Sequence, residues 1–460
     1  MKSSRLLFAT VVAYAITAYA QDTRQITEPK IPPSCIVLSA HLRVTNNALS
    51  EEDESKLDTE RIQKALDTCA KGKAVELKAD GTINAFLSGP LELRSDVTLL
   101  IDKGVTLYAS RNPKDYDTVP GACGTSGLDS KPCKPLIGVH DVHNAAVMGE
   151  GIIDGRGDKV VMGKSYTWWQ QSRAAEPTNA RYSAPRLIVA NRADELVLYK
   201  IRLHNSPNFH VTVNNTNGFT AWGVHLRTPT VRGTDARNTD GIDPGSSENI
   251  TIRESWIDNG DDNIAIKTGT HRMSVLNNHF YSGHGMSMGS ETYSGDSDIL
   301  VDNLTLDHTT SGIRIKSNVQ RGGQVRNVVY RHICMRAVEV PISISPFYNG
   351  QTTDGIADLG MKGDRTPDYK GVHMEDVHSM TAGTVQVAGL NADHITEISF
   401  NGVKIDGISS AQTHFRFTKA TVGVAGINFT ILGEGVTAPP VSSTTPNVSS
   451  CDNKFVPYED

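Results

Sequence analysis

Short apolar runs, separated by turn residues, recur along most of this chain. From about Leu91 onward, runs rich in Val, Ile and Leu alternate with segments of Gly, Asn, Asp and Ser. Runs of this length and composition are typical of β-strands, and the residues between them favour turns. Helical periodicity is scarce, and the best candidate is the segment 59–69, where Ile62, Ala65 and Leu66 lie at helical spacing. The predicted strands read VTLLI, AAVMG, RLIVAN, ELVLYKI, HVTVNN, ENITIRESWI, NIAIK, MSVLNNHF, DILVDNLTL, GIRIKS, VRNVVYRHI and PISIS.

The predicted strands return at a nearly constant interval. Ile250, Val275, Leu300 and Val325 follow one another at steps of 25 residues. A repeat of this length indicates a solenoid, whereas a β-sandwich or barrel has strands at about 8–12-residue spacing without the longer repeat. We therefore predict an all-β fold, a parallel β-helix whose coils stack about 4.8 Å apart. The helix over 59–69 is expected to cover the open first coil.

Four asparagines support the stacking of successive coils. Asn249, Asn277, Asn303 and Asn327 occupy comparable strand or turn positions in the repeat. Because residues one repeat apart become neighbours in a β-helix, we expect these side chains to form one stacked amide ladder.

Composition and charge narrow the class of protein. The chain has 460 residues, 38% hydrophobic and 21% charged, which disfavours wholesale disorder and a polytopic membrane protein. Its net charge of −6 disfavours a generally basic nucleic-acid binder. Length alone suggests about three domains, but the repeat favours one β-helix domain over residues 21–460. The Pro-, Ser- and Thr-rich end, about 438–460, is expected to be a surface tail.

The N-terminus has the pattern of an export signal. Lys2 and Arg5 precede an apolar run from Leu6 to Ile16, and Ala18-Tyr19-Ala20 fits a small-residue cleavage site. The alternative is a membrane anchor, but the run is shorter than the roughly 20 residues that span a bilayer. We predict that residues 1–20 are a signal peptide and that the protein is secreted and extracellular.

The cysteines fit an exported protein with disulfide bonds. Their count is even, and no CxxC spacing suggests a zinc site. We favour Cys35–Cys69, Cys123–Cys133 and Cys334–Cys451, one of the 15 pairings that six cysteines allow.

Four polar segments interrupt the apolar strands at about one-coil intervals. They are Asn238-Thr239-Asp240-Gly241, Gly260-Asp261-Asp262-Asn263, Gly283-His284-Gly285 and Arg314-Ile315-Lys316. Spacings of 21, 22 and 30 residues separate Asp240 from Asp261, Asp262 from His284, and His284 from Arg314. Each spacing is close to one coil, so we expect one column of polar residues on one face.

The chemistry of these segments favours a cleft. Ile313 and Ile315 would point inward, so strand alternation turns Arg314 and Lys316 outward, where they can hold a carboxylate ligand. A bend at Gly260 would let Asp261 and Asp262 face the same cleft. His284 lies between two glycines, so we expect little to shield it.

Each segment taken alone also has a simpler interpretation. The Asp-Asp-Asn turn is typical of solvated turns, the cations of an exposed strand and the histidine of a surface turn. A calcium loop through Asn238 and Asp240 fails, because Ala236 would fall at its first position and Ser247 at its twelfth. The co-occurrence of three acids, a histidine and two cations on successive coils favours a single site.

Three clustered carboxylates suit hydrolysis of a glycosidic bond, which needs a proton donor and a base. Stacking would place Asp240 roughly 5 Å from the Asp261–Asp262 pair at the backbone. Lateral displacement would widen the functional separation to about 6.5–9.5 Å, enough to admit a water and to give inversion. Mutual repulsion would keep one acid protonated. The cations would form a locally basic cleft for an acidic polymer, with contributions from Arg232, Arg237, Lys267 and Arg321.

The four phrases NTDGID, GDDNIAIK, GHGMSMGSE and GIRIKS, in this order, resemble the polygalacturonases of glycoside hydrolase family 28. The resemblance extends to FLSGPLEL and LLIDKGVTL and is strongest to the bacterial-type secreted endo-polygalacturonases. It implies a single-stranded, right-handed, pectin-lyase-like β-helix. It also implies inverting hydrolysis of α-1,4-galacturonosyl bonds in de-esterified pectin, without a metal or other cofactor.

The resemblance also implies roles for individual residues. Asp261 would be the general acid, and Asp240 and Asp262 would hold and deprotonate the attacking water. His284 would help to keep the acid protonated. The residues expected to bind substrate are Arg314, Lys316, Tyr348 and Asn238. A mild departure is Ser246-Ser247, where some fungal members have Asn-Ser.

Several alternative functions remain open at this point. The nearest are an exo-acting galacturonidase and a hydrolase of rhamnogalacturonan or xylogalacturonan. The absence of a large insertion after Asp240 favours endo action, because a blocked groove end usually needs inserted loops. A β-helical lyase would need calcium and an arginine base, and a non-catalytic carbohydrate-binding protein or adhesin would scatter its polar residues. The expected partner is polygalacturonate or pectin, bound by a monomer with no nucleic-acid or membrane partner.

Overall fold

The computed structural model describes residues 21–44, 48–178, 180–228, 236–350, 355–440 and 445–459. The predicted signal peptide, residues 1–20, lies outside this part of the chain. In the described residues, no helix is long and apolar enough to cross a membrane.

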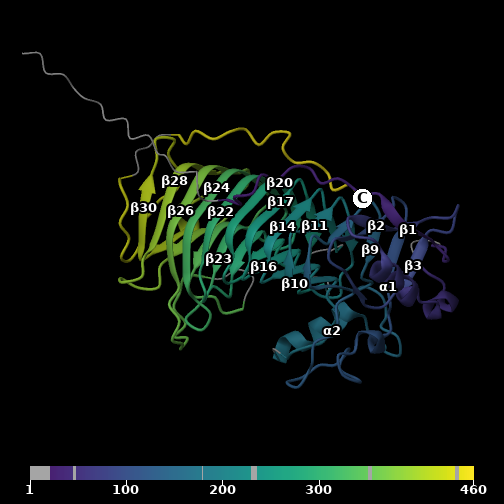
Figure 1. The fold of residues 1–460 in the computed structure, drawn as a ribbon. Helices are drawn as coiled ribbons and strands as arrows, with labels where there is room; N and C mark the ends of the chain where they lie inside the picture. The colour runs from purple at the N-terminus through teal and green to yellow at the C-terminus, as the bar shows by residue number, and fades with distance from the viewer. Residues whose placement is uncertain are drawn as a thin grey trace, which may run out of the picture.

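The chain winds into a parallel β-helix, as predicted (Figure 1). Strands from successive coils pair in parallel, so that β16 lies between β13 and β19. One sheet contains eleven strands: β4 (Leu91–Glu92), β7 (Ile137–His143), β10 (Ile188–Asp194), β13 (Val211–Asn214), β16 (Ile242–Gly245), β19 (Ile264–Ile266), β21 (Met286–Gly289), β23 (Ser311–Lys316), β25 (Val340–Ser345), β27 (Val385–Ala388) and β29 (Thr413–Arg416).

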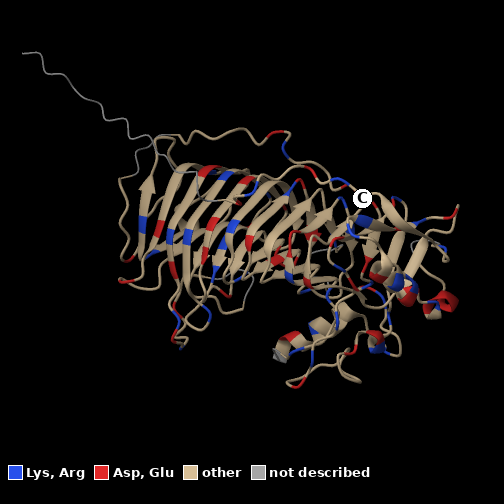
Figure 2. Cartoon of the chain, viewed as in Figure 1, with Lys and Arg blue, Asp and Glu red and all other residues tan. Residues whose placement is uncertain are grey.

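The other strands form a nineteen-strand network on the remaining sides of the coils. Figure 2 shows acidic and basic residues interspersed along the coils. The strands are β1 (Ser34–Ser39), β2 (Lys73–Lys78), β3 (Ala85–Ser88), β5 (Val97–Ile101), β6 (Thr106–Ala109), β8 (Ala146–Met148), β9 (Ile152–Asp154), β11 (Leu196–Tyr199), β12 (Arg202–His204), β14 (Asn217–Trp222), β15 (His225–Arg227), β17 (Glu248–Arg253), β18 (Trp256–Asn259), β20 (His271–Ser282), β22 (Asp296–Asp307), β24 (Gln324–Arg336), β26 (Asp368–Ser379), β28 (Thr396–Ile405) and β30 (Thr418–Val422).

The core is a set of apolar columns that run through the coils. In the eleven-strand sheet, Ile242, Ile264, Met286, Ile313 and Ile342 are paired in register from coil to coil, and all are fully buried. Each such side chain contributes roughly 1.5–3 kcal/mol by leaving water. Because side chains alternate along a strand, this column fixes which neighbouring residues face out of the same sheet.

The predicted N-terminal helix is present as α1 (Thr59–Thr68), and it packs Ile62, Ala65 and Leu66 into the core. A second helix, α2 (Trp168–Ala175), was not predicted; it has only eight residues and begins with a capping box between Thr167 and Gln170. An element this short shows too few turns for helical periodicity to stand out. Within the described ranges, four short 3₁₀ helices cover Glu51–Ser55, Pro113–Tyr116, Glu176–Thr178 and Ser410–Gln412.

The coils are not of uniform length. Ile252 pairs with Val275, Val275 with Val301, Val301 with Tyr330, and Tyr330 with Met374. The constant step of 25 residues is therefore wrong in detail, although the repeat it indicated is real. Strand registry is preserved because the loops between strands absorb the differences in length.

The predicted single asparagine ladder is also wrong. Asn277 and Asn303 stack directly, with a 2.9 Å bond from Asn303 Nδ2 to Asn277 Oδ1. Asn249 and Asn327 belong to a different column, in which Asn327 Nδ2 donates to Asp298 Oδ1. All four asparagines have φ between 53° and 57°. Asparagine tolerates this left-handed conformation better than most residues, which explains why it recurs at two separate turns.

Both ends of the described chain run back across the coils (Figure 1). The backbone N–H of Asp22 donates to Ser274 Oγ, and Arg24 binds Glu195 at 2.8 Å. At the other end, the Tyr281 hydroxyl donates to the carbonyl of Val456. The three disulfides join the predicted pairs, Cys35–Cys69, Cys123–Cys133 and Cys334–Cys451, and the last attaches the tail to β24.

Asn278 provides a test of how side chains tie the coils together. It is fully buried, accepts from the Ser255 N–H at 2.9 Å and donates to the Ile252 carbonyl at 2.9 Å. Asn278→Ala leaves both backbone groups unpaired, so we expect the free energy of unfolding to fall by about 2–5 kcal/mol. Asn303→Ala, on the exposed ladder, should cost only about 0–1 kcal/mol. Urea unfolding measures both, and equal losses would contradict this view of the coil contacts.

Candidate active site

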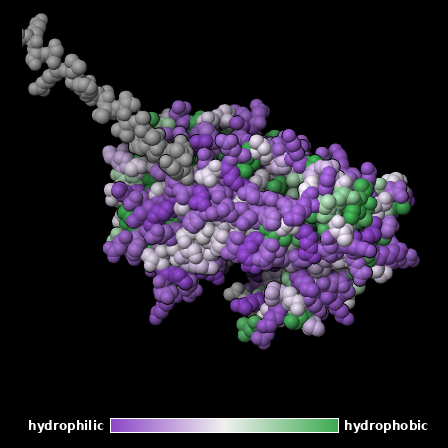
Figure 3. Space-filling view, viewed as in Figure 1, coloured by the Kyte–Doolittle hydropathy of each residue, from purple (hydrophilic) through white to green (hydrophobic). Residues whose placement is uncertain are grey.

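A cleft of about 930 Å³ lies over the eleven-strand sheet. Its lining includes all eight predicted catalytic and substrate-binding residues: Asp240, Asp261, Asp262, His284, Arg314, Lys316, Tyr348 and Asn238. Figure 3 shows a hollow beside the lobe that carries α2. The structure thus brings together residues that lie more than a hundred positions apart in the sequence.

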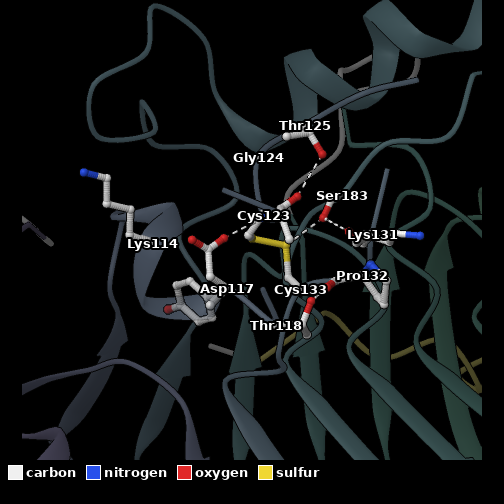
Figure 4. The surroundings of a disulfide bond; sticks show 12 residues. Lys114, Asp117, Thr118, Cys123, Gly124, Thr125, Lys131, Pro132, Cys133 and Ser183 are labelled. Atoms are coloured by element: carbon white, nitrogen blue, oxygen red, sulfur yellow. Dashed lines mark hydrogen bonds between the residues drawn. A yellow bond between two sulfur atoms is a disulfide. The ribbon is translucent and has the colours of Figure 1, made fainter. Parts of the chain in front are cut away.

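One wall of the cleft comes from the lobe that carries α2. Arg173 of α2 lines the cleft, and Gln171 Nε2 donates to the carbonyl of Thr125 at 3.0 Å. Thr125 lies within the loop that the Cys123–Cys133 disulfide closes (Figure 4). The disulfide therefore fastens the loop against which this wall rests.

Strand registry explains part of the convergence and corrects the prediction of a single column. Ile242 pairs with Ile264, and Ile264 pairs with Met286. Asp240, Asp262 and His284 each lie two residues before one of these paired residues, so the same register places them side by side on successive coils. Arg314 instead pairs with Ser287, and Lys316 with Gly289. The two cations therefore lie three and five residues further along the strand direction, in neighbouring columns of the same face.

The two adjacent acids Asp261 and Asp262 face one cleft because the chain bends at Gly260 before β19 begins. Asn259 holds this bend, since its Nδ2 donates to the carbonyls of Thr239 and Asp262. Carboxylate oxygens of Asp240, Asp261 and Asp262 lie within 4.8 Å of one another. The three acids therefore converge on one point of the cleft.

Asp262 is the most strongly held of the three acids. Its side chain is 1% exposed, Lys316 Nζ lies 2.6 Å from Oδ2, and Ser287 Oγ donates to Oδ1 at 2.7 Å. The Arg314 guanidinium lies 3.7 Å from Oδ1. Burial opposes ionisation, but Lys316 and Arg314 outweigh it and hold the pKa of Asp262 well below its usual range. Asp262 is therefore a carboxylate at any pH near neutrality.

Asp240 has the opposite environment. It is buried, and its Oδ1 has no hydrogen-bond partner among the described residues. Burial, followed by repulsion from Asp261 and Asp243, raises the pKa of Asp240 well above its usual value. The acids form a coupled group that retains a proton, and burial favours Asp240 as its position in the free protein.

A fourth acid, Asp243, lies buried beneath the cleft and was not predicted from the sequence. Both of its oxygens lack a hydrogen-bond partner in the described structure, and Lys267 Nζ lies 3.8 Å from Oδ2. Burial raises the pKa of Asp243 to about 7. Strand alternation after Ile242 gave a usable signal, because a residue next to an inward isoleucine must face outward.

Asp261 is more accessible than Asp262, and its side chain is 18% exposed. Its Oδ2 accepts from the Asn238 N–H at 3.1 Å and from Asn238 Nδ2 at 3.4 Å. Asn238 itself accepts from the Tyr182 hydroxyl at 3.3 Å. Asn238 therefore contacts the acid that the family resemblance makes the proton donor, in addition to lining the cleft.

His284 is less open than its two glycines suggested, since only 20% of its side chain is exposed. Its Nε2 lies 3.9 Å from Asp261 Oδ1, and its Nδ1 bonds to Thr310 Oγ1 at 2.8 Å. Burial lowers the pKa of His284, although Asp261 and Asp262 oppose this shift. The ring lies near the acid but beyond direct hydrogen-bond distance from it in the free protein.

Arg314 and Lys316 face the cleft, as strand alternation predicted, but both are buried. They contact Asp262 from below, and the Tyr348 ring lies 5.7 Å from Arg314 Cζ and 5.4 Å from Lys316 Nζ. These distances are typical of cation–π contacts. The two cations are thus engaged within the protein before any substrate arrives.

The cleft is not simply basic, contrary to the prediction. Six Lys and Arg side chains line it among the described residues, but so do six Asp and Glu side chains. Arg237, Lys267 and Arg321 are present as predicted, and Arg232 lies outside the described residues. The acids that offset them include Glu176, Glu291 and Glu339, which come from segments between the strands.

The three acids are also the one group of the described residues close enough to suggest a metal site. Lys316 and Ser287 already occupy the two oxygens of Asp262. A cation bound to all three acids would have to displace or repel Lys316. The donor set therefore fits an ion pair within the protein better than a resident metal ion.

The fold is a parallel β-helix with a carboxylate cluster in a cleft along it, and the chain matches a family of glycosyl hydrolases. Together these define the class of this protein as a glycoside hydrolase. The chain belongs to the glycosyl hydrolases family 28, whose model matches residues 69–425.

Known relatives cover nearly all of the chain. An endo-polygalacturonase of Pectobacterium carotovorum subsp. carotovorum is 40% identical over 87% of this chain and 93% of its own length. A polygalacturonase of Ralstonia solanacearum is 33% identical over 99% of this chain and 97% of its own length. The solved polygalacturonase from Erwinia carotovora ssp. carotovora superposes with a TM-score of 0.72 at 36% identity, covering 94% of this chain and 100% of that one.

Asp243→Asn tests the electrostatics beneath the cleft. A folded-state pKa raised to about 7 means that wild type loses stability as pH rises from the unfolded value near 4 through 7. Asparagine does not ionise, so the variant should gain stability relative to wild type over this window. Urea unfolding from pH 4 to pH 8 measures the difference, and parallel profiles would contradict the raised pKa of this buried acid, which has no hydrogen-bond partner in the described structure.

Proposed function

We propose that this chain is an endo-polygalacturonase that hydrolyses α-1,4-galacturonosyl bonds of de-esterified pectin with inversion. The observation that carries the proposal is the convergence of Asp240, Asp261 and Asp262 over two cations in a family 28 fold. The identity to the Pectobacterium endo-polygalacturonase, over most of both chains, supports the same activity.

In the proposed reaction, Asp261 protonates the glycosidic oxygen as the bond to the anomeric carbon breaks. Asp262, which is ionised, takes a proton from the attacking water, and Asp240 helps to hold that water. Water oxygen forms the new bond to the anomeric carbon. The proton that the cluster retains on Asp240 is within reach of Asp261, because the nearest oxygens of the three acids lie within 4.8 Å.

The remaining residues serve the acid and the substrate. His284, 3.9 Å from Asp261, would help to maintain the protonation of the acid. Tyr348 would contact a sugar ring, and Arg314 and Lys316 would attract its carboxylate while they hold Asp262. Asn238 would orient Asp261 and line the same subsite.

The length of the cleft supports endo action. Its lining runs from Phe209 through Asp240, Asp262 and His284 to Glu339, on successive coils. At about 4.8 Å per coil, this corresponds to roughly 20–25 Å, which is long enough for several sugar units. A chain bound along such a cleft places internal bonds over the acids.

We also propose that the protein is secreted as a monomer whose partner is extracellular pectin, without a nucleic-acid or membrane partner. The N-terminal pattern of residues 1–20 and the three disulfides support export.

The activity is tested with residues 21–460 on polygalacturonate in the presence of a chelator. We expect rapid shortening of the polymer, new reducing ends and no absorbance from unsaturated products. Asp261→Asn should reduce kcat by about 10²–10⁴-fold, because it removes the proton donor. Asp258→Asn, which changes a partly buried acid of β18 that does not line the cleft, is the matched control.

Other outcomes would identify the alternatives. Monomer release with slow shortening indicates an exo enzyme, and a need for calcium with unsaturated products indicates a lyase. No cleavage either with the chelator or with added calcium favours a binding protein. The carboxylate spacing does not fix the stereochemistry, so proton NMR of the first products tests inversion, which should give the β-anomer. Near-normal activity of Asp261→Asn would contradict the assignment of the acid.

A further inference from the structure

Glu291 lies in the cleft between cations of two neighbouring coils. It follows β21, while Lys267 follows β19 in the preceding coil and Arg321 follows β23 in the next. Arg321 NH1 donates to Glu291 Oε1 at 2.9 Å, and Lys267 Nζ lies 3.9 Å from Oε2. Ser290 Oγ also donates to Oε1, at 3.2 Å. One protein carboxylate therefore bridges two cations where the cleft takes substrate.

The environment keeps this carboxylate charged. Partial burial opposes ionisation of Glu291, but Lys267 and Arg321 outweigh it and lower the pKa of this carboxyl. Lys267 is in turn held by the Gly289 carbonyl at 3.2 Å and by Asp243 at 3.8 Å. The bridge is built from residues with fixed partners, and it remains partly open to the cleft, since the Glu291 side chain is 36% exposed and that of Arg321 is 49% exposed.

A carboxylate at this position works against binding of a uniformly charged polymer. An ionised galacturonate unit at the Lys267–Arg321 subsite must compete with Glu291 for the same two cations and approach its negative charge. A methyl-esterified unit is neutral, so it meets no such repulsion and leaves the bridge intact. The physical effect of Glu291 is therefore to weaken discrimination against the ester at one subsite.

We propose that Glu291 is a specificity-determining residue that lets the cleft accept a methyl-esterified galacturonate unit between Lys267 and Arg321. This inference rests on the proposed polygalacturonase activity. Glu291 contacts the two cations and not the carboxylate cluster, so it sets which unit binds and leaves the chemical step unchanged.

Glu291→Gln tests the proposal, because it removes the charge and keeps the shape. We measure kcat and KM on polygalacturonate and on partially methyl-esterified pectin. The ratio of kcat/KM for the two substrates should rise about three- to fivefold in favour of polygalacturonate, the effect of a partly exposed ion pair. The change should come from a lower KM on polygalacturonate with kcat preserved, and it should shrink at high salt.

Two further variants keep the result interpretable. Glu176→Gln removes the same charge from the cleft lobe, where Glu176 pairs with Arg173 at 2.9 Å. A general charge effect would shift its ratio as much as that of Glu291→Gln and would overturn the proposal. Arg321→Gln removes the cation instead and should shift the ratio in the opposite direction.

The remaining outcomes separate this inference from the function on which it rests. Wild type that does not cleave polygalacturonate contradicts the proposed function itself. Wild type that cleaves it, together with an unchanged ratio in Glu291→Gln, contradicts only the role of Glu291. Parallel loss of kcat on both substrates would show a structural role and would also overturn the proposal.

Discussion

The site depends on one buried ion pair, between Lys316 of β23 and Asp262 just before β19, two coils earlier. The two side chains are 7% and 1% exposed. Removing such charges from water costs several kcal/mol per ion unless geometry and further hydrogen bonds compensate. Arg314 and Ser287 supply that compensation. The pair keeps Asp262 ionised. The proton that the carboxylate cluster retains is therefore carried by Asp240, whose pKa is raised.

The β-helix makes this pair possible, because stacking converts distance in sequence into contact in space. Registry in the eleven-strand sheet holds Lys316 beside Gly289. The same registry places Gly289 beside Lys267 of the preceding coil, one residue after the pair Ile266–Met288. A Cβ at Gly289 would overlap the carbonyl oxygen of Lys316, so glycine at the middle coil permits the close approach of these two backbones. The same sheet carries Asp243 beneath the cleft, so that lysines and acids alternate around the reacting positions. These cations already form ion pairs with acids of the protein. An acidic substrate therefore meets cations whose charge is partly balanced.

Much of this could be predicted from the sequence, for identifiable reasons. Alternation around Ile313 and Ile315 correctly placed Arg314 and Lys316 on the cleft face, and the apolar spacing of Ile62, Ala65 and Leu66 located α1. Sequence patterns do not predict the position of a residue when that position depends on the length of the loops between strands. Coil lengths vary, so equal spacing assigned Arg314 to the column of His284 and joined two asparagine columns into one. Glu291 lies beyond the end of its strand, so no periodicity placed it in the cleft, and the cleft was expected to be more basic than it is.

The central claim is that Lys316 keeps Asp262 ionised. The most direct test is the pH dependence of kcat/KM for wild type and for Lys316→Gln on polygalacturonate, with Arg314 left in place. Loss of the lysine raises the pKa of Asp262, so the acidic limb of the profile should move to higher pH in the variant. An acidic limb at the same pH in both proteins would contradict the account, because Asp262 would then owe its charge to something other than this pair.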